Sequence, residues 1–151
     1  MKETLKVGAT MIAELVRDGK VIDTRTVHNM VVNSGYDLVC ALIGDSTRPN
    51  QIGYVGMGTG TAATTAQTTA LGTEWGTRVA VTYSHTTGTT LLTLSCTVPA
   101  HTGSMVALTE SGLFNASTSG TMFDRVTFTA INKEPADTIN MRYIINLVDT
   151  E

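Results

Sequence analysis

The glycines at every second position from Gly56 to Gly60 form the pattern in this sequence that most resembles a site for chemistry. The stretch Tyr54–Ala63 runs from a short apolar segment into these glycines and then into a Thr/Ala tract. Glycine-rich turns bind phosphate when a helix begins directly behind them and its first amides hold the anion. Here Thr61-Ala62-Ala63-Thr64-Thr65 follows, and no Lys stands where a P-loop requires one. We therefore expect no cofactor at this stretch, and interpret the glycines as room for a close strand or subunit.

The histidines are too dispersed to suggest a metal centre. His28, His85 and His101 fall on different predicted segments, and no Cys or carboxylate stands near them at the spacing of metal ligands. The chain also shows no Ser elbow, no Cys/His pair and no paired acids. We expect neither a metal site nor an enzyme.

Glu110 is the most informative single acid, because it stands in an otherwise apolar segment two residues before Gly112. It is either a buried acid with a raised pKa, or a carboxylate that accepts backbone hydrogen bonds or pairs with Arg78 or Arg125. The second alternative is favoured. A catalytic reading of Glu110 would require a deep pocket with further acids around it.

The two cysteines, Cys40 and Cys96, lie far apart in the sequence and form no CxxC motif. Buried free thiols are the favoured interpretation, since cysteine is often found in protein cores. A disulfide between the two is left open.

The elements expected to position these residues are almost all strands. Apolar residues alternate with polar ones in several segments separated by Gly-, Asn- or Pro-containing turns, and Asp18-Gly19 marks a hairpin. The expected strands are 5–15, 21–32, 52–57, 77–85, 92–98, 105–110, 113–114, 122–130 and 139–147, with a bulge at Ser111-Gly112 and a central position for the last strand. One short helix is expected around 34–43, capped by Asn33 or Ser34 and stopped by Gly44.

This pattern predicts an all-β fold and a single domain over residues 1–151. About eight to nine antiparallel strands at turn spacing are typical of a β-sandwich or a jelly-roll-like barrel. The formal net charge of −3 offers no basic stripe for nucleic acid. The first residues do not resemble a signal peptide, and no apolar run reaches the roughly 18 residues of a membrane span.

The distribution of charge is more informative than its total. Between Gln51 and Gly120 the only charged residues are Glu74, Arg78 and Glu110. Protein surfaces normally carry far more charge, whereas the centres of protein interfaces are depleted in it. We therefore expect this tract to lie in subunit contacts, the alternative being a monomer with a neutral surface. The candidate contact residues are Gly56, Gly58, Gly60, Thr61, Thr64, Thr65, Thr68, Thr69 and Trp75.

Four segments, in this order, resemble a family of small virion structural proteins of tailed bacteriophages, of the tail-fibre and collar type. They are Asn29-Met-Val-Val-Asn-Ser-Gly35, Tyr54-Val-Gly-Met-Gly-Thr-Gly60, Leu108-Thr-Glu-Ser-Gly-Leu-Phe-Asn115 and Asn132-Lys-Glu-Pro-Ala-Asp-Thr138. The resemblance implies a β-sandwich assembled in many copies on a phage particle, in contact with neck, tail, fibre or capsid proteins. It transfers no catalytic residue.

The resemblance thus predicts a homo-oligomer located in the virion. The charge and the lack of a long apolar run predict no nucleic-acid and no membrane partner. A capsid decoration protein is an alternative within the same class. A carbohydrate- or receptor-binding module of a fibre is an alternative of another class, for which Trp75 is the candidate contact residue.

Overall fold

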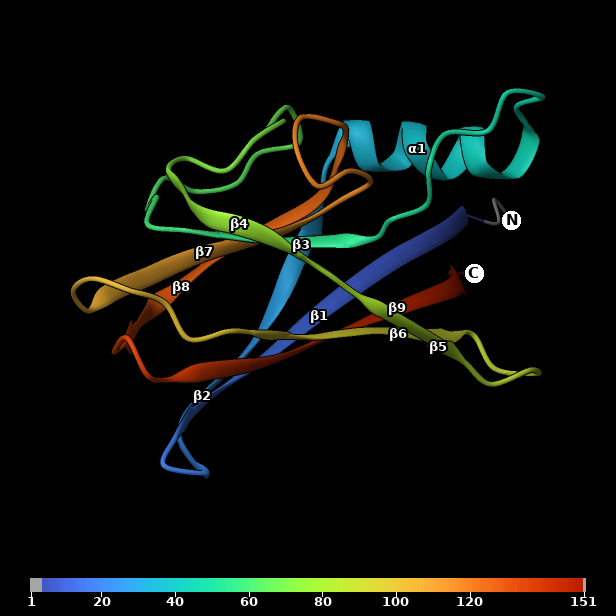
Figure 1. Ribbon diagram of the computed structural model, residues 1–151. Coiled ribbons are helices and arrows are strands. Elements are labelled where there is room, and N and C mark those ends of the chain that lie inside the picture. Colours follow the sequence, from blue (N-terminus) through green and yellow to red (C-terminus); the bar gives the residue numbers. More distant parts are fainter. Residues whose placement is uncertain (1–3, 151) are drawn as a thin grey trace.

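The computed structural model describes residues 4–150 as nine antiparallel strands and one helix, which confirms the predicted all-β class (Figure 1). The elements are β1 (Thr4–Arg17), β2 (Lys20–Val31), α1 (Asn33–Gly44), β3 (Tyr54–Gly58), β4 (Glu74–Ala80), β5 (Thr82–His85), β6 (Leu91–Val98), β7 (Val106–Phe114), β8 (Met122–Lys133) and β9 (Thr138–Thr150).

The two longest alternating segments of the sequence pair with each other. β1 and β9 run antiparallel, with Met11 opposite Tyr143 and Ala13 opposite Met141. These side chains point to the same face of the sheet and are completely or almost completely buried. β9 lies between β1 and β6, as its clean alternation predicts. The interior of the sheet is therefore built around this pair.

All nine strands belong to one sheet in the order β4-β3-β7-β8-β2-β1-β9-β6-β5. Its two edge strands, β4 and β5, are consecutive in the chain and separated only by Val81. A sheet whose opposite edges are joined in this way must curl on itself, and it forms a nearly closed barrel (Figure 1). The sequence prediction of a single strand over 77–85 is wrong, because Val79 pairs with Val55 whereas Tyr83 pairs with Leu94.

The prediction of two short strands interrupted at Ser111-Gly112 is also wrong. β7 is continuous from Val106 to Phe114, and its register with β8 shifts between Leu108 and Glu110 and again between Leu113 and Phe114. Gly112 sits regularly opposite Gly56 on one side and Arg125 on the other. The close approach of the Asp124 carbonyl, which a Cβ at this position would meet, accounts for the glycine.

The helix lies where the sequence places it, but its ends differ from the expectation. Val32 occupies the N-cap without a side-chain cap, and the Ser34 hydroxyl donates instead to the Met122 carbonyl at 2.8 Å. Gly44 is the last helical residue and not the residue after the end. Gly35 packs directly against the backbone of Phe123, where any side chain would collide with the carbonyl. These contacts fix α1 against β8.

Both cysteines are free thiols. Cys96 is half-buried, but Cys40 is exposed on α1, so the expectation that both thiols are buried is wrong for Cys40. Over residues 4–150, no helix has both the length and the apolar character needed to cross a membrane.

Candidate functional site

A buried ion pair lies on the outer face of the sheet, between neighbouring strands. Glu110 of β7 has no exposed surface, and the Arg125 side chain of β8 is 2% exposed. Arg125 donates from Nε at 2.8 Å and lies with Nη2 at 2.7 Å, both to Oε2 of Glu110. The structure thereby confirms the favoured sequence interpretation of Glu110.

The loop formed by residues 59–73, hereafter the neutral loop, closes over this pair. The backbone amides of Gly60 and Thr73 donate to Oε1 of Glu110, and that of Gly72 donates to Oε2, each at 2.8 Å. Burial alone would raise the pKa of Glu110, but these amides and the Arg125 guanidinium together hold that pKa below its ordinary value. The carboxylate is therefore charged at neutral pH and ties both ends of the neutral loop to β7.

Arg125 completes the attachment from the other side. Its Nη1 donates to the Ala62 carbonyl at 2.8 Å and to the Thr64 hydroxyl at 3.1 Å. The guanidinium and carboxylate therefore have partners in both the sheet and the loop, as a buried pair requires.

The glycine pattern that opens the sequence is explained by this carboxylate. A Cβ built on Gly58 or on Gly60 would collide with the carboxylate of Glu110, and Gly72 lies against Gly60. Gly56 and Gly58 are buried within the chain itself. The close neighbour that these glycines accommodate is thus a strand of the same chain, and the exposed residues that follow belong to the neutral loop.

A second apolar cluster fills the space between the neutral loop and the sheet. Leu71 of the loop packs with Phe114 and Met122 on the outer face, next to Val32 and Tyr54. The Arg78 guanidinium lies over the Phe114 ring, 3.5 Å from its centroid, and donates to the carbonyls of Ala116 and Ser119. Apolar burial and the ion pair together make this loop an ordered surface.

The predicted contact residues of the neutral loop are not equivalent. Thr61, Thr65 and Thr69 are exposed, whereas Thr64 and Thr68 are half-buried. Thr64 accepts the hydrogen bond from Arg125, and the Thr68 hydroxyl accepts one from the Thr65 amide at 2.9 Å. The exposed members present hydroxyls and small apolar groups without charge.

Trp75 lies apart from that surface. Its half-buried ring packs edge-on against His101, with the centroids 5.0 Å apart, and contributes to the main core. The buried Lys133 ammonium donates to Nδ1 of His101 at 3.0 Å, and burial lowers the pKa of Lys133. Trp75 therefore packs against the core of the barrel with part of its surface exposed.

The barrel interior contains a second buried acid, Asp124. It accepts hydrogen bonds from the Leu113 amide and from the Asn29 side chain, each at 3.0 Å. Burial raises the pKa of Asp124 to about 7, against an ordinary value of 3.8. The Asn29 side-chain oxygen has no hydrogen-bond partner. This group is sealed from solvent, so its protonation bears on stability.

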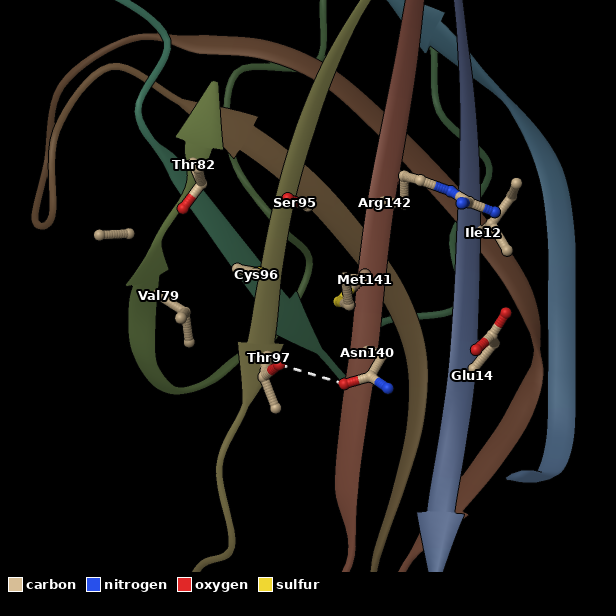
Figure 2. A pocket seen from close by; sticks show the side chains of 11 residues that line it. Ile12, Glu14, Val79, Thr82, Ser95, Cys96, Thr97, Asn140, Met141 and Arg142 are labelled. Atoms are coloured by element: carbon tan, nitrogen blue, oxygen red, sulfur yellow. Dashed lines mark hydrogen bonds between the residues drawn. The ribbon is translucent and has the colours of Figure 1, made fainter. Parts of the chain in front are cut away.

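A further hollow lies beside β4 and β6, where these two strands diverge (Figure 2). It has a volume of about 580 Å³ and is lined by β4, β5, β6, β9 and β1. Burial raises the pKa of the Cys96 thiol there to about 11, and Asn140 is held by a hydrogen bond from Thr97 at 3.1 Å. Within residues 4–150, no three His, Cys, Asp or Glu side chains gather in a way that could hold a metal ion.

No protein-family model, no curated protein and no solved structure matches this chain.

Proposed function

We propose that this chain is a structural component of a tailed-bacteriophage virion, acting in many copies through its neutral loop. The docking sites would lie on neck, tail, collar or fibre proteins, with the capsid shell as the alternative position. The observation that carries the proposal is an ordered surface whose nearby charges are all engaged within the chain.

The charges of the 51–120 tract are all used internally. Glu110 is buried against Arg125, and Arg78, whose side chain is 8% exposed, pairs with Glu74 at 2.7 Å. The neutral loop above them presents only uncharged side chains. A surface of this kind loses little hydration when it is covered, and interface centres are depleted in charge for this reason.

The loop is also ordered before any partner arrives. Glu110 and Arg125 hold it at five polar contacts, and Leu71 anchors it in an apolar cluster. A surface that is already ordered loses less conformational entropy when it binds. Repetition of the surface in many copies allows each contact to be weak.

The family resemblance supports the same proposal. Segment 54–60 supplies the glycines beside Glu110, segment 108–115 supplies Glu110 itself, and segment 29–35 contacts the loop through the hydrogen bond from the Asn33 amide to the Ala66 carbonyl at 2.8 Å. Three of the four similar segments therefore build one substructure.

The experiment introduces a charged side chain on the surface of the neutral loop and measures how much of the variant chain is incorporated into assembled particles. Thr69→Lys adds a cation at an exposed position, and Thr26→Lys on β2 is the matched control away from the loop. We expect Thr69→Lys to lower incorporation at least tenfold while the melting temperature stays close to that of the unmodified chain. Equal incorporation of the two variants would refute the role of the loop.

A further inference from the structure

The two edges of the sheet are protected to very different degrees. Natural proteins protect an exposed strand edge with charges, bulges or proline, because an unprotected edge pairs with other chains. β4 follows this rule: it carries Glu74 and Arg78, and its register with β3 shifts around Gly76, whose φ is 67°. Pairing of another strand with this edge is disfavoured.

β5, at the other edge, is only four residues long but has no charge, bulge or proline to protect it. Thr82, Tyr83, Ser84 and His85 are all exposed, and the strand pairs without a register shift with β6 alone. It contains neither proline nor a residue that is formally charged at pH 7. The outer edge of β5 thus offers backbone groups to a further strand.

An apolar hollow lies beside this edge, between α1 and the mouth of the barrel. Its volume is about 290 Å³, and its wall includes Val39 and Leu42 of α1 and Leu92 of β6. Three large residues of its wall are also exposed to solvent: Ile43 at 70%, Tyr83 at 61% and Leu147 at 39%. Large apolar side chains that line one hollow and remain exposed mark an interaction surface.

Tyr83 also lines a second hollow, which shares Gln51 and Ile52 with the first. The second hollow has a volume of about 500 Å³ and is bordered by residues 49–54. Among the described residues, no charged side chain lines either hollow. Two copies that meet through these hollows therefore bring no charged lining residues together.

We propose that β5 pairs antiparallel with β5 of a second copy across a two-fold axis, with the two Tyr83 rings packed beside the apolar hollows. A two-fold contact requires a surface that complements itself, and an uncharged antiparallel edge strand meets that condition. This inference specifies one of the self-contacts that the proposed function requires, and it uses a face other than the neutral loop.

The test is sedimentation velocity of the purified full chain from micromolar to near-millimolar concentration, at pH 7.5. The inference predicts a monomer–dimer equilibrium that Tyr83→Lys and Ile43→Lys each weaken at least tenfold. Tyr36→Lys is the matched control, because Tyr36 is 42% exposed on α1 but does not line the apolar hollow. Ile43→Lys should fold normally, since the exposed Ile43 side chain contributes little to the core. A weaker dimer in this variant therefore reports on the contact and not on misfolding.

Hydrogen exchange locates the contact. Amides of residues 82–85 should gain protection as the dimer forms in the unmodified chain, and should gain none in Tyr83→Lys at the same concentration. A chain that stays monomeric at every concentration overturns the inference, and this is also the result expected if β5 pairs only with a different protein. A dimer that both variants leave unchanged overturns it as well. Particle incorporation is measured separately, so a dimer absent from virions would contradict the proposed function alone.

Discussion

The carboxylate of Glu110 and the guanidinium of Arg125 meet at 2.7 Å with both side chains shielded from water. The two residues are 15 apart in the sequence, on adjacent strands, and each also bonds the loop above them. A buried pair of this kind is weak support for stability compared with apolar packing, but loss of one partner leaves an uncompensated charge. Its role here is to determine where the neutral loop lies.

Removal of the charge on Glu110 should therefore lower the free energy of unfolding strongly. We expect Glu110→Gln to destabilise the chain by about 3–5 kcal/mol, because Arg125 stays buried without a counter-charge. The measurement is urea unfolding at pH 7. Glu74→Gln, which breaks the more exposed pair with Arg78, is the control and should cost less than about 1 kcal/mol. Similar losses in the two variants would contradict the special position of Glu110.

Gly58 and Gly60, beside the Glu110 carboxylate, should not tolerate even the methyl side chain of alanine. Gly58→Ala and Gly60→Ala each place a methyl group against the Glu110 carboxylate, and we expect each to lower the free energy of unfolding by at least about 2 kcal/mol. Gly8→Ala on β1 is the control, because a Cβ there meets nothing within 4 Å. That variant should be neutral or stabilising by about 0.5–1 kcal/mol, since it reduces the freedom of the unfolded chain. Normal stability of Gly60→Ala would rule out the close approach to Glu110.

Asp124 should make stability depend on pH in the unusual direction for an acid. Its pKa is raised to about 7 in the fold, against 3.8 ordinarily, so the folded chain holds a proton that the unfolded chain has lost. The contribution of Asp124 is then fully present below pH 4 and declines as pH rises to about 7, with a slope of at most about 1.4 kcal/mol per pH unit. Asp124→Asn should remove this slope in thermal unfolding between pH 4.5 and 7.5. An unchanged slope in the variant would assign the pH dependence to other groups.

Asp137 should make the stability of the chain depend on pH in the opposite direction, and at lower pH. Arg17 donates to both oxygens of Asp137, at 2.9 and 2.7 Å, and holds the pKa of that carboxyl at about 2. Its contribution is present above pH 4 and is lost as pH falls through 2. Because Arg17 is 41% exposed, we expect Asp137→Asn to cost only about 1 kcal/mol at pH 7, and less in high salt. A loss that salt does not reduce would show that the backbone bond to the Glu134 amide dominates instead.

The alternating segments of the sequence predict most of the sheet, because period-2 burial is a local signal. The alternation of Ile139, Met141 and Tyr143 predicts a buried strand, and the three side chains are buried in β9. The transfer of the chain from β4 to β5 could not be predicted this way. Val79, Val81 and Tyr83 alternate as one strand would, and no Gly or Pro marks the point where the chain leaves one edge of the sheet for the other.

The candidate site was predictable only in part. The charge-poor tract and the unusual position of Glu110 are visible in the sequence. The link between them is not, because it joins the Gly60 amide to a carboxylate 50 residues away. The repeated glycines indicate that something comes close, but only the sheet register shows that the neighbour is Glu110 and not a phosphate or a second subunit.

The proposed role as a repeated component of a phage particle is tested most directly by counting copies of this chain in purified particles. Tailed-phage particles that carry the gene should be purified on a density gradient and analysed by quantitative mass spectrometry against the major capsid protein. We expect a fixed stoichiometry of several copies per particle, retained after a salt wash because the contacts are uncharged. Absence from purified particles, or a variable amount that the wash removes, would contradict it.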